Sequence, residues 1–227
     1  MKLILFDIDG TLVSTGAAGS DAMREVFADL SGIPDGFAGV EMSGKTDAAI
    51  FREALSKHQL DEQAIPLALF HERYIPRLRF ALQEPHRQRR LMPGLPAILE
   101  VLMGKADIVL GLLTGNFAMG AQLKLESFGL WHYFQLGAYG SDHHDRNELV
   151  PIAQQRVQAL LGHTITAQHT WVIGDTPRDI ACAHVHGARA LAVATGSYTV
   201  AELQRHQPEH CCEDLGDVTT ILRVLQA

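Results

Sequence analysis

Residues 3–11 read Leu3-Ile4-Leu5-Phe6-Asp7-Ile8-Asp9-Gly10-Thr11, and this stretch decides the fold. Its first four residues form an unbroken apolar run, which is typical of a strand buried on both faces of a parallel sheet. Small polar residues and two aspartates follow directly. We therefore looked for the same order, an apolar run and then a polar turn, in the rest of the chain.

The same order recurs three times. The further apolar runs are 107–113, 170–173 and 190–193. Helical patterns follow them at 118–128, 177–186 and 200–205, and another is expected at 95–103, after Pro93-Gly94. Strands that alternate with helices require helical crossovers between parallel strands. The chain is therefore predicted to be an α/β protein with a doubly wound, Rossmann-like parallel sheet.

One long stretch breaks this alternation. Between the first two strands the apolar residues follow a helical period, with faces at 22–30, 50–55 and 65–82. We expect an all-helical domain at 15–88, inserted into an α/β core made of 1–14 and 89–227. Two short crossings join the domains, and the glycines there are expected to permit hinge motion (Gly16, Gly19 and Gly94).

Acidic residues gather where the predicted strands end. Asp7 and Asp9 follow the first strand, and Asp175 and Asp179 follow the third. The carboxyl ends of parallel strands meet at one edge of the sheet, which is where ligands bind. Clustered carboxylates repel one another and ionise together only when a cation compensates them. An all-oxygen site of this kind suits Mg²⁺, so we predict a magnesium site at this edge.

Composition limits the classes of function. The 227 residues include 19 basic and 26 acidic side chains, a net charge of −7, which argues against nucleic acid or an anionic membrane as partner. No apolar run is long enough to span a membrane, and the first residues are too short a stretch for a signal peptide. The three cysteines have no metal-site spacing and read as reduced thiols. We expect a cytoplasmic protein.

Together these motifs resemble a known family. Asp7-Ile8-Asp9-Gly10-Thr11, Leu112-Leu113-Thr114-Gly115-Asn116 and Gly174-Asp175-Thr176-Pro177-Arg178-Asp179 are similar, in order and in placement, to the motifs of the haloacid dehalogenase superfamily. Within it, the chain resembles the phosphoglycolate phosphatase group, whose members carry an α-helical cap after the first strand. The likeness covers essentially the whole chain and implies a phosphatase.

The resemblance also implies roles for individual residues. Asp7 would be the nucleophile that forms an aspartyl-phosphate, and Asp9 the general acid and then the base. Thr114 and the amide of Gly115 would bind a phosphoryl oxygen, and Asn116 would bind substrate beside them. Mg²⁺ would be held by a further set of oxygens, from Asp7, the main-chain carbonyl of Asp9, Asp175 and Asp179.

The chain departs from the family pattern at one catalytic position. The family carries a lysine at the start of the helix before the third catalytic strand, whereas Arg146 is the cation in that region here. Its guanidinium can bridge Asp7 and a phosphoryl oxygen through a planar fork. We predict that Arg146 takes the place of the lysine; a solvent-exposed arginine at a helix start is the alternative.

A second motif points to a different class. Residues 39–46 match Gly-x-x-x-x-Gly-Lys-Thr, the phosphate-binding P-loop, but no buried strand precedes them as that loop requires. We therefore interpret Lys45, Thr46 and Asp47 as a cap loop that contacts the part of the substrate other than phosphate.

The predicted function is Mg²⁺-dependent hydrolysis of a small phosphorylated metabolite, either phosphoglycolate-like or a sugar phosphate. A phosphonatase, with Lys45 as Schiff base, and a phosphomutase stay open as alternatives, and a P-loop nucleotide-binding protein is a weaker one. Asp9 argues against a dehalogenase, which needs no second aspartate. The sequence is also compatible with a homodimer.

Overall fold

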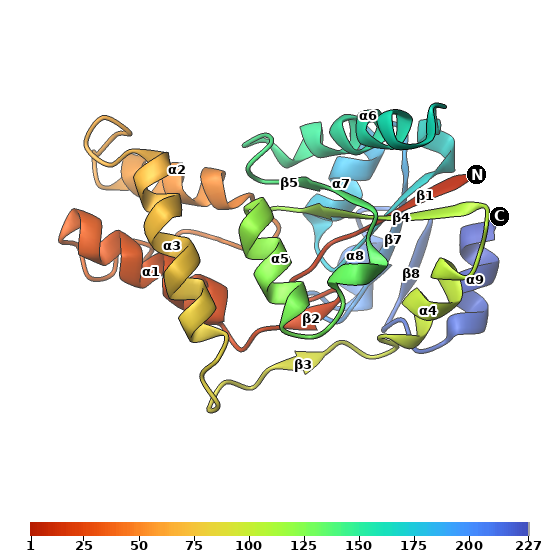
Figure 1. Cartoon of the computed structure of the whole chain (residues 1–227), viewed down its shortest axis with the longest axis horizontal. Helices are drawn as coiled ribbons and strands as arrows, with labels where there is room; N and C mark the ends of the chain where they lie inside the picture. Colours follow the sequence, from red (N-terminus) through yellow and green to blue (C-terminus); the bar gives the residue numbers. More distant parts are fainter. Residues whose placement is uncertain (227) are drawn as a thin grey trace.

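A six-stranded parallel sheet forms the centre of the molecule, in a computed structural model that describes residues 1–226 (Figure 1). In spatial order the strands are β5 (Leu136–Tyr139), β4 (Ile108–Thr114), β1 (Lys2–Phe6), β6 (Thr170–Gly174), β7 (Arg189–Val193) and β8 (His210–Cys212). From β1 the chain adds β4 and β5 on one side of the sheet and then β6, β7 and β8 on the other, so the direction of winding changes at β1. The prediction of a doubly wound α/β fold is confirmed.

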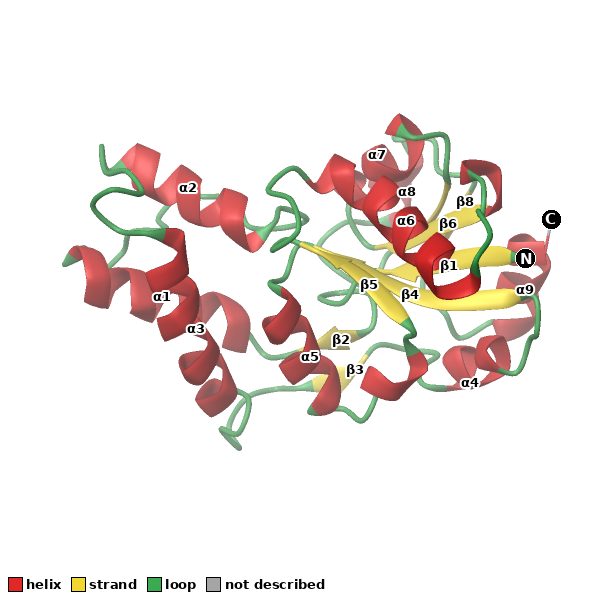
Figure 2. Cartoon of the chain, turned by 45° about the horizontal axis from the view of Figure 1, so that its top comes forward, coloured by secondary structure: helices red, strands yellow, loops and turns green. Residues whose placement is uncertain are grey.

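Helices cover both faces of the sheet, as Figure 2 shows. One face packs on α4 (Ala97–Met103), α5 (Ala118–Glu126) and α9 (Val218–Gln226), and the other on α6 (Leu149–Leu161), α7 (Pro177–Val185) and α8 (Val200–Gln204). Side chains of β1 alternate between the faces: Ile4 and Phe6 pack in the first cluster, Leu3 and Leu5 in the second. Both faces are therefore apolar, which explains the unbroken apolar run of β1.

The register of the central strands brings their ends together. Phe6 pairs with Leu112 of β4 and with Ile173 of β6. Phe6, Leu112 and Ile173 therefore lie side by side near the strand ends. The residues that follow them, which include Asp7, come together at the same edge. This alignment is what gathers the motifs from distant parts of the sequence at one edge.

Three helices between β1 and β4 pack on one another rather than on the sheet. They are α1 (Ala18–Ser31), α2 (Asp47–Lys57) and α3 (Leu67–Ala81), and we call residues 18–81 the helical insertion. It has its own apolar cluster, in which Phe51 stacks on Phe70 with ring centroids 4.4 Å apart. The insertion lies at one end of the molecule (Figure 1), where Phe117 and Leu123 of the α5 region join its cluster.

The two crossings between the insertion and the sheet lie together. They form a small antiparallel pair, β2 (Val13–Ser14) with β3 (Arg90–Leu91). Gly16 and Gly94 there have φ of 61° and 90°, in the left-handed region that favours glycine. Gly19 lies in the first turn of α1, and its role as a hinge residue stays a prediction.

The remaining elements are short. They are three 3₁₀ turns, η1 (Trp131–Tyr133), η2 (Arg146–Glu148) and η3 (Ala167–His169). Among residues 1–226 no helix has both the length and the apolar character that crossing a bilayer demands.

Candidate active site

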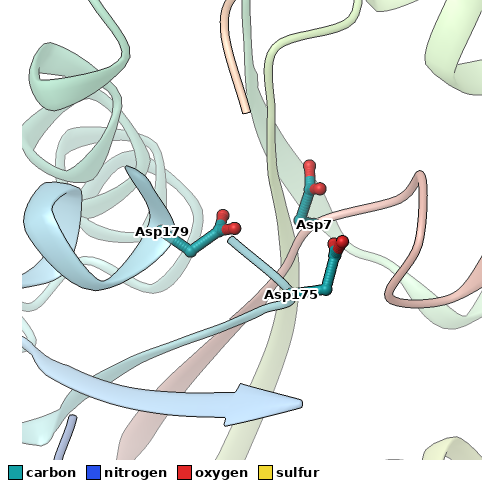
Figure 3. A group of neighbouring side chains, drawn as sticks. All are labelled: Asp7, Asp175 and Asp179. Atoms are coloured by element: carbon teal, nitrogen blue, oxygen red, sulfur yellow. The ribbon is translucent and has the colours of Figure 1, made fainter. Parts of the chain in front are cut away.

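Three of the four predicted carboxylates converge at the carboxyl edge of the sheet. Asp7 follows β1, Asp175 follows β6, and Asp179 lies in the first turn of α7, as Figure 3 shows. Each offers an oxygen within 4.8 Å of the others, and all three residues are buried. Asp9 stands apart from this group and lies with its side chain at the cavity described below.

Local structure fixes the two carboxylates of the third motif. Asp179 closes a capping box at the start of α7, where its Oδ2 accepts hydrogen bonds from the amide and the hydroxyl of Thr176. Asp175 accepts a hydrogen bond from Thr11 Oγ1 at 2.9 Å. A Cβ on Gly10 would lie 2.4 Å from Asp175 Oδ2, so the glycine of the first motif provides room for this carboxylate.

Burial and mutual repulsion make this group electrostatically unbalanced. Desolvation, together with the nearby charges of Asp179 and Asp7, raises the pKa of Asp175 to about 8. Desolvation likewise raises the pKa of Asp7 to about 6, although Arg146 opposes the rise. A divalent cation would relieve both causes, since it replaces the lost hydration and screens the repulsion. The donor set therefore fits a hard cation such as Mg²⁺.

Arg146 lies against the same carboxylates. Its side chain is buried, with Nη2 3.1 Å from Asp7 Oδ1 and in contact with Asp179 Oδ1. The guanidinium also donates to the carbonyls of Leu113 and Gly44, each at 3.3 Å. Arg146 is thus not a solvent-exposed helix-start residue. It joins the first motif, the third motif and the loop of the insertion.

The second motif lies beside Asp9. Asn116 Nδ2 donates to Asp9 Oδ2 and to Thr114 Oγ1, both at 2.8 Å. Gly115 packs tightly against the insertion, because a Cβ there would lie 2.0 Å from the carbonyl oxygen of Lys45. Its amide and its neighbours line the cavity.

Lys124 is a site residue that sequence reasoning missed. It lies in α5 with only 4% of its surface exposed, and its Nζ donates to Asp9 Oδ2 and to Asn116 Oδ1, each at 2.6 Å. A signal existed: Lys124 follows Phe117 and Ala121 at the helical spacing of a buried face and precedes Leu125. A lysine within such an apolar stripe indicates a buried partner of opposite charge.

The predicted cap loop contacts the core through both backbone and side-chain hydrogen bonds. The amide of Asp47 donates to the Gly115 carbonyl at 2.8 Å, and Asp47 Oδ2 accepts from the amide of Phe117 at 2.8 Å. Thr46 caps α2 and donates to the His144 carbonyl at 2.6 Å. Lys45 forms an ion pair with Glu53.

The P-loop interpretation lacks its structural support. Residues 35–46 form turns and irregular chain, and no strand lies between β2 and α2. The loop has no sheet edge from which to present its amides, as the missing strand signal before residue 39 predicted.

A cavity of about 420 Å³ separates the core from the insertion. The core contributes the carboxylates of the first and third motifs, with Thr114, Lys124 and Arg146. The insertion and its crossings contribute a mixed set of side chains, which includes Ser20, Met23, Lys45, Asp47, Ile50 and Tyr74. The cavity thus has an ionic floor at the sheet and a more varied roof.

A doubly wound sheet with carboxylates on adjacent strand ends, beneath a helical insertion, defines an α/β protein with a ligand site at the carboxyl edge of its sheet. A family comparison is more specific: residues 4–193 match the model of haloacid dehalogenase-like hydrolases. The chain belongs to this family and is a hydrolase.

Relatives of known designation match nearly the whole chain. A probable phosphatase, IndB, of Dickeya dadantii is 28% identical over 95% of this chain and 91% of its own. A 5'-nucleotidase of Pseudomonas aeruginosa is 26% identical over 96% and 94%. A phosphoglycolate phosphatase of Pseudomonas syringae pv. tomato is 26% identical over 94% and 77%.

Solved structures share the fold. A hydrolase from Pseudomonas syringae superposes with a TM-score of 0.71 at 20% identity, over 98% of both chains. A haloacid dehalogenase-like hydrolase from Streptococcus pneumoniae gives 0.70 at 20% identity, also over 98% of both. The strand order and the helical insertion are therefore an arrangement that distant sequences share.

Proposed function

We propose that this hydrolase is a Mg²⁺-dependent phosphatase, which cleaves a small phosphorylated metabolite through an aspartyl-phosphate on Asp7. The observation that carries the proposal is the convergence of Asp7, Asp175 and Asp179 beside Arg146 at the floor of the cavity. The phosphatase designations of the relatives support the same reaction.

In the first step, an oxygen of Asp7 forms a bond to phosphorus while the bond from phosphorus to the leaving oxygen breaks. Asp9 gives its proton to that leaving oxygen. In the second step, Asp9 takes a proton from water, the water oxygen bonds to phosphorus, and Asp7 leaves as a carboxylate. Phosphate and an alcohol are the products, and both aspartates return to their starting states.

Thr114, the Gly115 amide and Arg146 would bind the phosphoryl oxygens, where negative charge is concentrated. Asp7, the main-chain carbonyl of Asp9, Asp175 and Asp179 would hold Mg²⁺, with Asp179 binding directly or through water. When bound, the ion neutralises charge on the phosphoryl group so that a carboxylate can approach it. The raised pKa values of Asp7 and Asp175 support this assignment, because their causes, lost hydration and repulsion between carboxylates, are those that a divalent cation would compensate.

We further propose that residues 15–88 act as a cap on a core made of 1–14 and 89–227. Two hydrogen bonds support this closure: the Asp47 amide donates to the Gly115 carbonyl, and the Asp47 carboxylate accepts from the Phe117 amide. Lys45, Thr46, Asp47 and Asn116 would then face the part of the substrate other than phosphate. The cavity suits a small polar ligand, such as a phosphoglycolate-like compound or a sugar phosphate.

The other family reactions have less support. A phosphonatase would need Lys45 as a free amine, but its Nζ is paired with Glu53. A mutase would need its product to be phosphorylated again by the enzyme, which a phosphate-transfer assay with a hexose phosphate would detect. A cytoplasmic location and a homodimer remain predictions, as does the absence of nucleic-acid and membrane partners.

The test is hydrolysis of p-nitrophenyl phosphate and of a panel of phosphorylated metabolites that includes phosphoglycolate, with and without MgCl₂. Asp7→Asn keeps the size of the side chain but removes the nucleophile, so we expect activity to fall by at least about 10³-fold. Removal of the metal with a chelator is expected to have a similar effect. Undiminished hydrolysis by Asp7→Asn would refute the assignment of Asp7.

A further inference from the structure

A second buried cation lies in the site and pairs with a different carboxylate from those that Arg146 contacts. Arg146 pairs with Asp7 and Asp179, whereas Lys124 pairs with Asp9. The Lys124 side chain is 5% exposed and that of Asp9 is 44% exposed, toward the cavity that both residues line. Each aspartate of the first motif therefore has its own cationic partner.

The contacts of Lys124 fix the orientation of a neighbouring amide. A lysine ammonium can only donate hydrogen bonds, so the Asn116 atom that it contacts at 2.6 Å must be the carbonyl oxygen. The amide nitrogen of Asn116 consequently faces Asp9 Oδ2 and Thr114 Oγ1, both at 2.8 Å. Lys124 therefore determines how Asn116 can donate to Asp9.

The two oxygens of Asp9 are used unequally. Oδ2 accepts from both Lys124 and Asn116, whereas Oδ1 accepts no hydrogen bond from any group in residues 1–226. Two donors on one oxygen fix the carboxyl group in one rotational state. The other oxygen is left free beside the cavity, where a substrate would lie.

We propose that Lys124 is a positioning residue for Asp9, which it holds with Oδ1 directed at the leaving-group oxygen of the substrate. This inference rests on the function proposed above and adds a residue to it. Proton transfer depends on close approach and alignment, so a carboxyl group that is already oriented lowers the cost of reaching the transition state. Lys124 itself touches neither phosphorus nor the leaving oxygen in this scheme.

Packing supports a functional rather than a purely structural role. A methionine or leucine at 124 would continue the apolar face of α5, and a buried ion pair seldom adds net stability over such packing. The insertion also accommodates the ammonium: a Cβ on Gly19 of α1 would lie 3.0 Å from Lys124 Nζ. Gly19, which we also predict to permit hinge motion, thus leaves room for Lys124.

The direction of the side chain explains how a residue of a helix reaches the end of a strand. Side chains of an α-helix tilt toward its N-terminus, and α5 begins at Ala118, two residues after Asn116. Lys124 lies in the last turn, so its long side chain extends back along the helix toward the second motif.

The test compares two aryl phosphates of nearly the same shape. p-Nitrophenolate leaves readily as an anion, whereas phenolate is a poorer leaving group that gains more from a proton. We expect Lys124→Met to lower kcat/KM for phenyl phosphate by about tenfold or more, and for p-nitrophenyl phosphate by less than about threefold. The parameter kcat/KM is used because it reports only the steps up to departure of the leaving group. An equal loss for both substrates, or none, would overturn the proposal.

A double-mutant cycle separates this inference from the function on which it rests. In an Asp9→Asn background Lys124→Met should cause little further loss, because the group that it positions is already gone. A further tenfold loss would mean that Lys124 acts elsewhere. If Asp9→Asn itself leaves phenyl phosphate hydrolysis unchanged, the proposed role of Asp9 fails instead.

Two further variants make the result interpretable. Lys105→Met removes a lysine outside the cavity and should leave both substrates unchanged. Lys124→Gln retains a hydrogen-bond donor without the charge. If Lys124→Met does not fold, Lys124→Gln replaces it in the comparison of the two aryl phosphates and in the double-mutant cycle. Lys124→Gln with wild-type kcat/KM for phenyl phosphate would contradict the requirement for the ammonium, whereas a selective loss would support it.

Discussion

At the scale of single residues, the site is organised by the pairing of acids with bases. Arg146 is within 3.1 Å of Asp7 and also contacts Asp179. Desolvation lowers the pKa of Arg146, but the charges of these two carboxylates raise it by more, so the pKa is raised overall. The guanidinium is therefore charged whenever the protein is folded. Its flat fork can contact two carboxylates and two carbonyls at once, which an ammonium on a shorter chain cannot do.

Arginine and lysine should consequently not be interchangeable at position 146. We expect Arg146→Lys to lower kcat/KM for p-nitrophenyl phosphate by about 10- to 100-fold with a small change in thermal stability. Arg146→Met should in addition lower the free energy of unfolding by about 3 kcal/mol in metal-free protein, because it leaves two buried carboxylates without their cation. Steady-state kinetics and urea unfolding measure the two effects.

The matched control is Arg156→Lys. Arg156 also forms a fork, with Asp142, but its side chain is 41% exposed and lies outside the cavity. Activity should not change, and stability should change by less than about 1 kcal/mol. Wild-type kcat/KM in Arg146→Lys would show that the planar fork is dispensable.

The carboxylates were predictable from sequence because strand ends are local signals. Asp7 and Asp175 each follow an apolar run, and the parallel pairing of β1 with β6 brings the ends of the two runs to the same edge of the sheet. Lys124 was not predictable in the same way, because its partner Asp9 is 115 positions away and no local motif marks a helical lysine as buried. Only its place in an apolar stripe distinguishes it from a solvent-exposed lysine.

At the scale of elements, the strands that sequence analysis recovered are the central ones. β1, β4, β6 and β7 are largely buried and read as apolar runs. β8 at one edge is half-buried and reads His-Cys-Cys. β5 at the other edge has only four residues, Leu-Gly-Ala-Tyr, and its two end residues are partly exposed, so neither strand gives a clear apolar run. β2 and β3 are two residues each and depend on one another for pairing, which no local pattern reveals.

One loop contact depends on the absence of a side chain. A Cβ on Gly115 would lie 2.0 Å from the Lys45 carbonyl oxygen, and backbone atoms cannot yield as a flexible side chain can. We expect Gly115→Ala to displace the loop at Asp47 and to lower kcat/KM by about tenfold or more. Hydrogen exchange should quicken at the Asp47 amide, which donates to the Gly115 carbonyl.

Gly104→Ala serves as the control for this loop. Gly104 has φ of −72°, and a Cβ there would meet its nearest neighbours at 3.6 Å, an ordinary contact. It should alter neither activity nor exchange at Asp47. If Gly115→Ala behaved the same way, docking of the loop would not matter for catalysis.

At the scale of the whole molecule, the charge of the site couples stability to pH. Burial raises the pKa of Asp175 to about 8 and those of Asp7 and Asp47 to about 6. In the unfolded chain an aspartate has a pKa of about 3.9. Between about pH 4 and pH 8 the folded, metal-free protein therefore holds more protons than the unfolded chain, so its free energy of unfolding must fall as pH rises.

Mg²⁺ should reverse this trend, because the ion binds the ionised carboxylates that the metal-free fold disfavours. We expect the melting temperature of metal-free protein to decrease from about pH 5 to about pH 8, and the increase on adding MgCl₂ to be larger at the higher pH. Differential scanning calorimetry with and without the ion measures both.

Asp175→Asn removes the carboxyl group with the highest of these pKa values, so it should flatten the metal-free slope and remove most of the increase due to the ion. Metal-free protein that grew more stable over this range would contradict the account, because it would mean that the buried carboxylates are already compensated by Arg146 and Lys124 and that the site has no need of a metal.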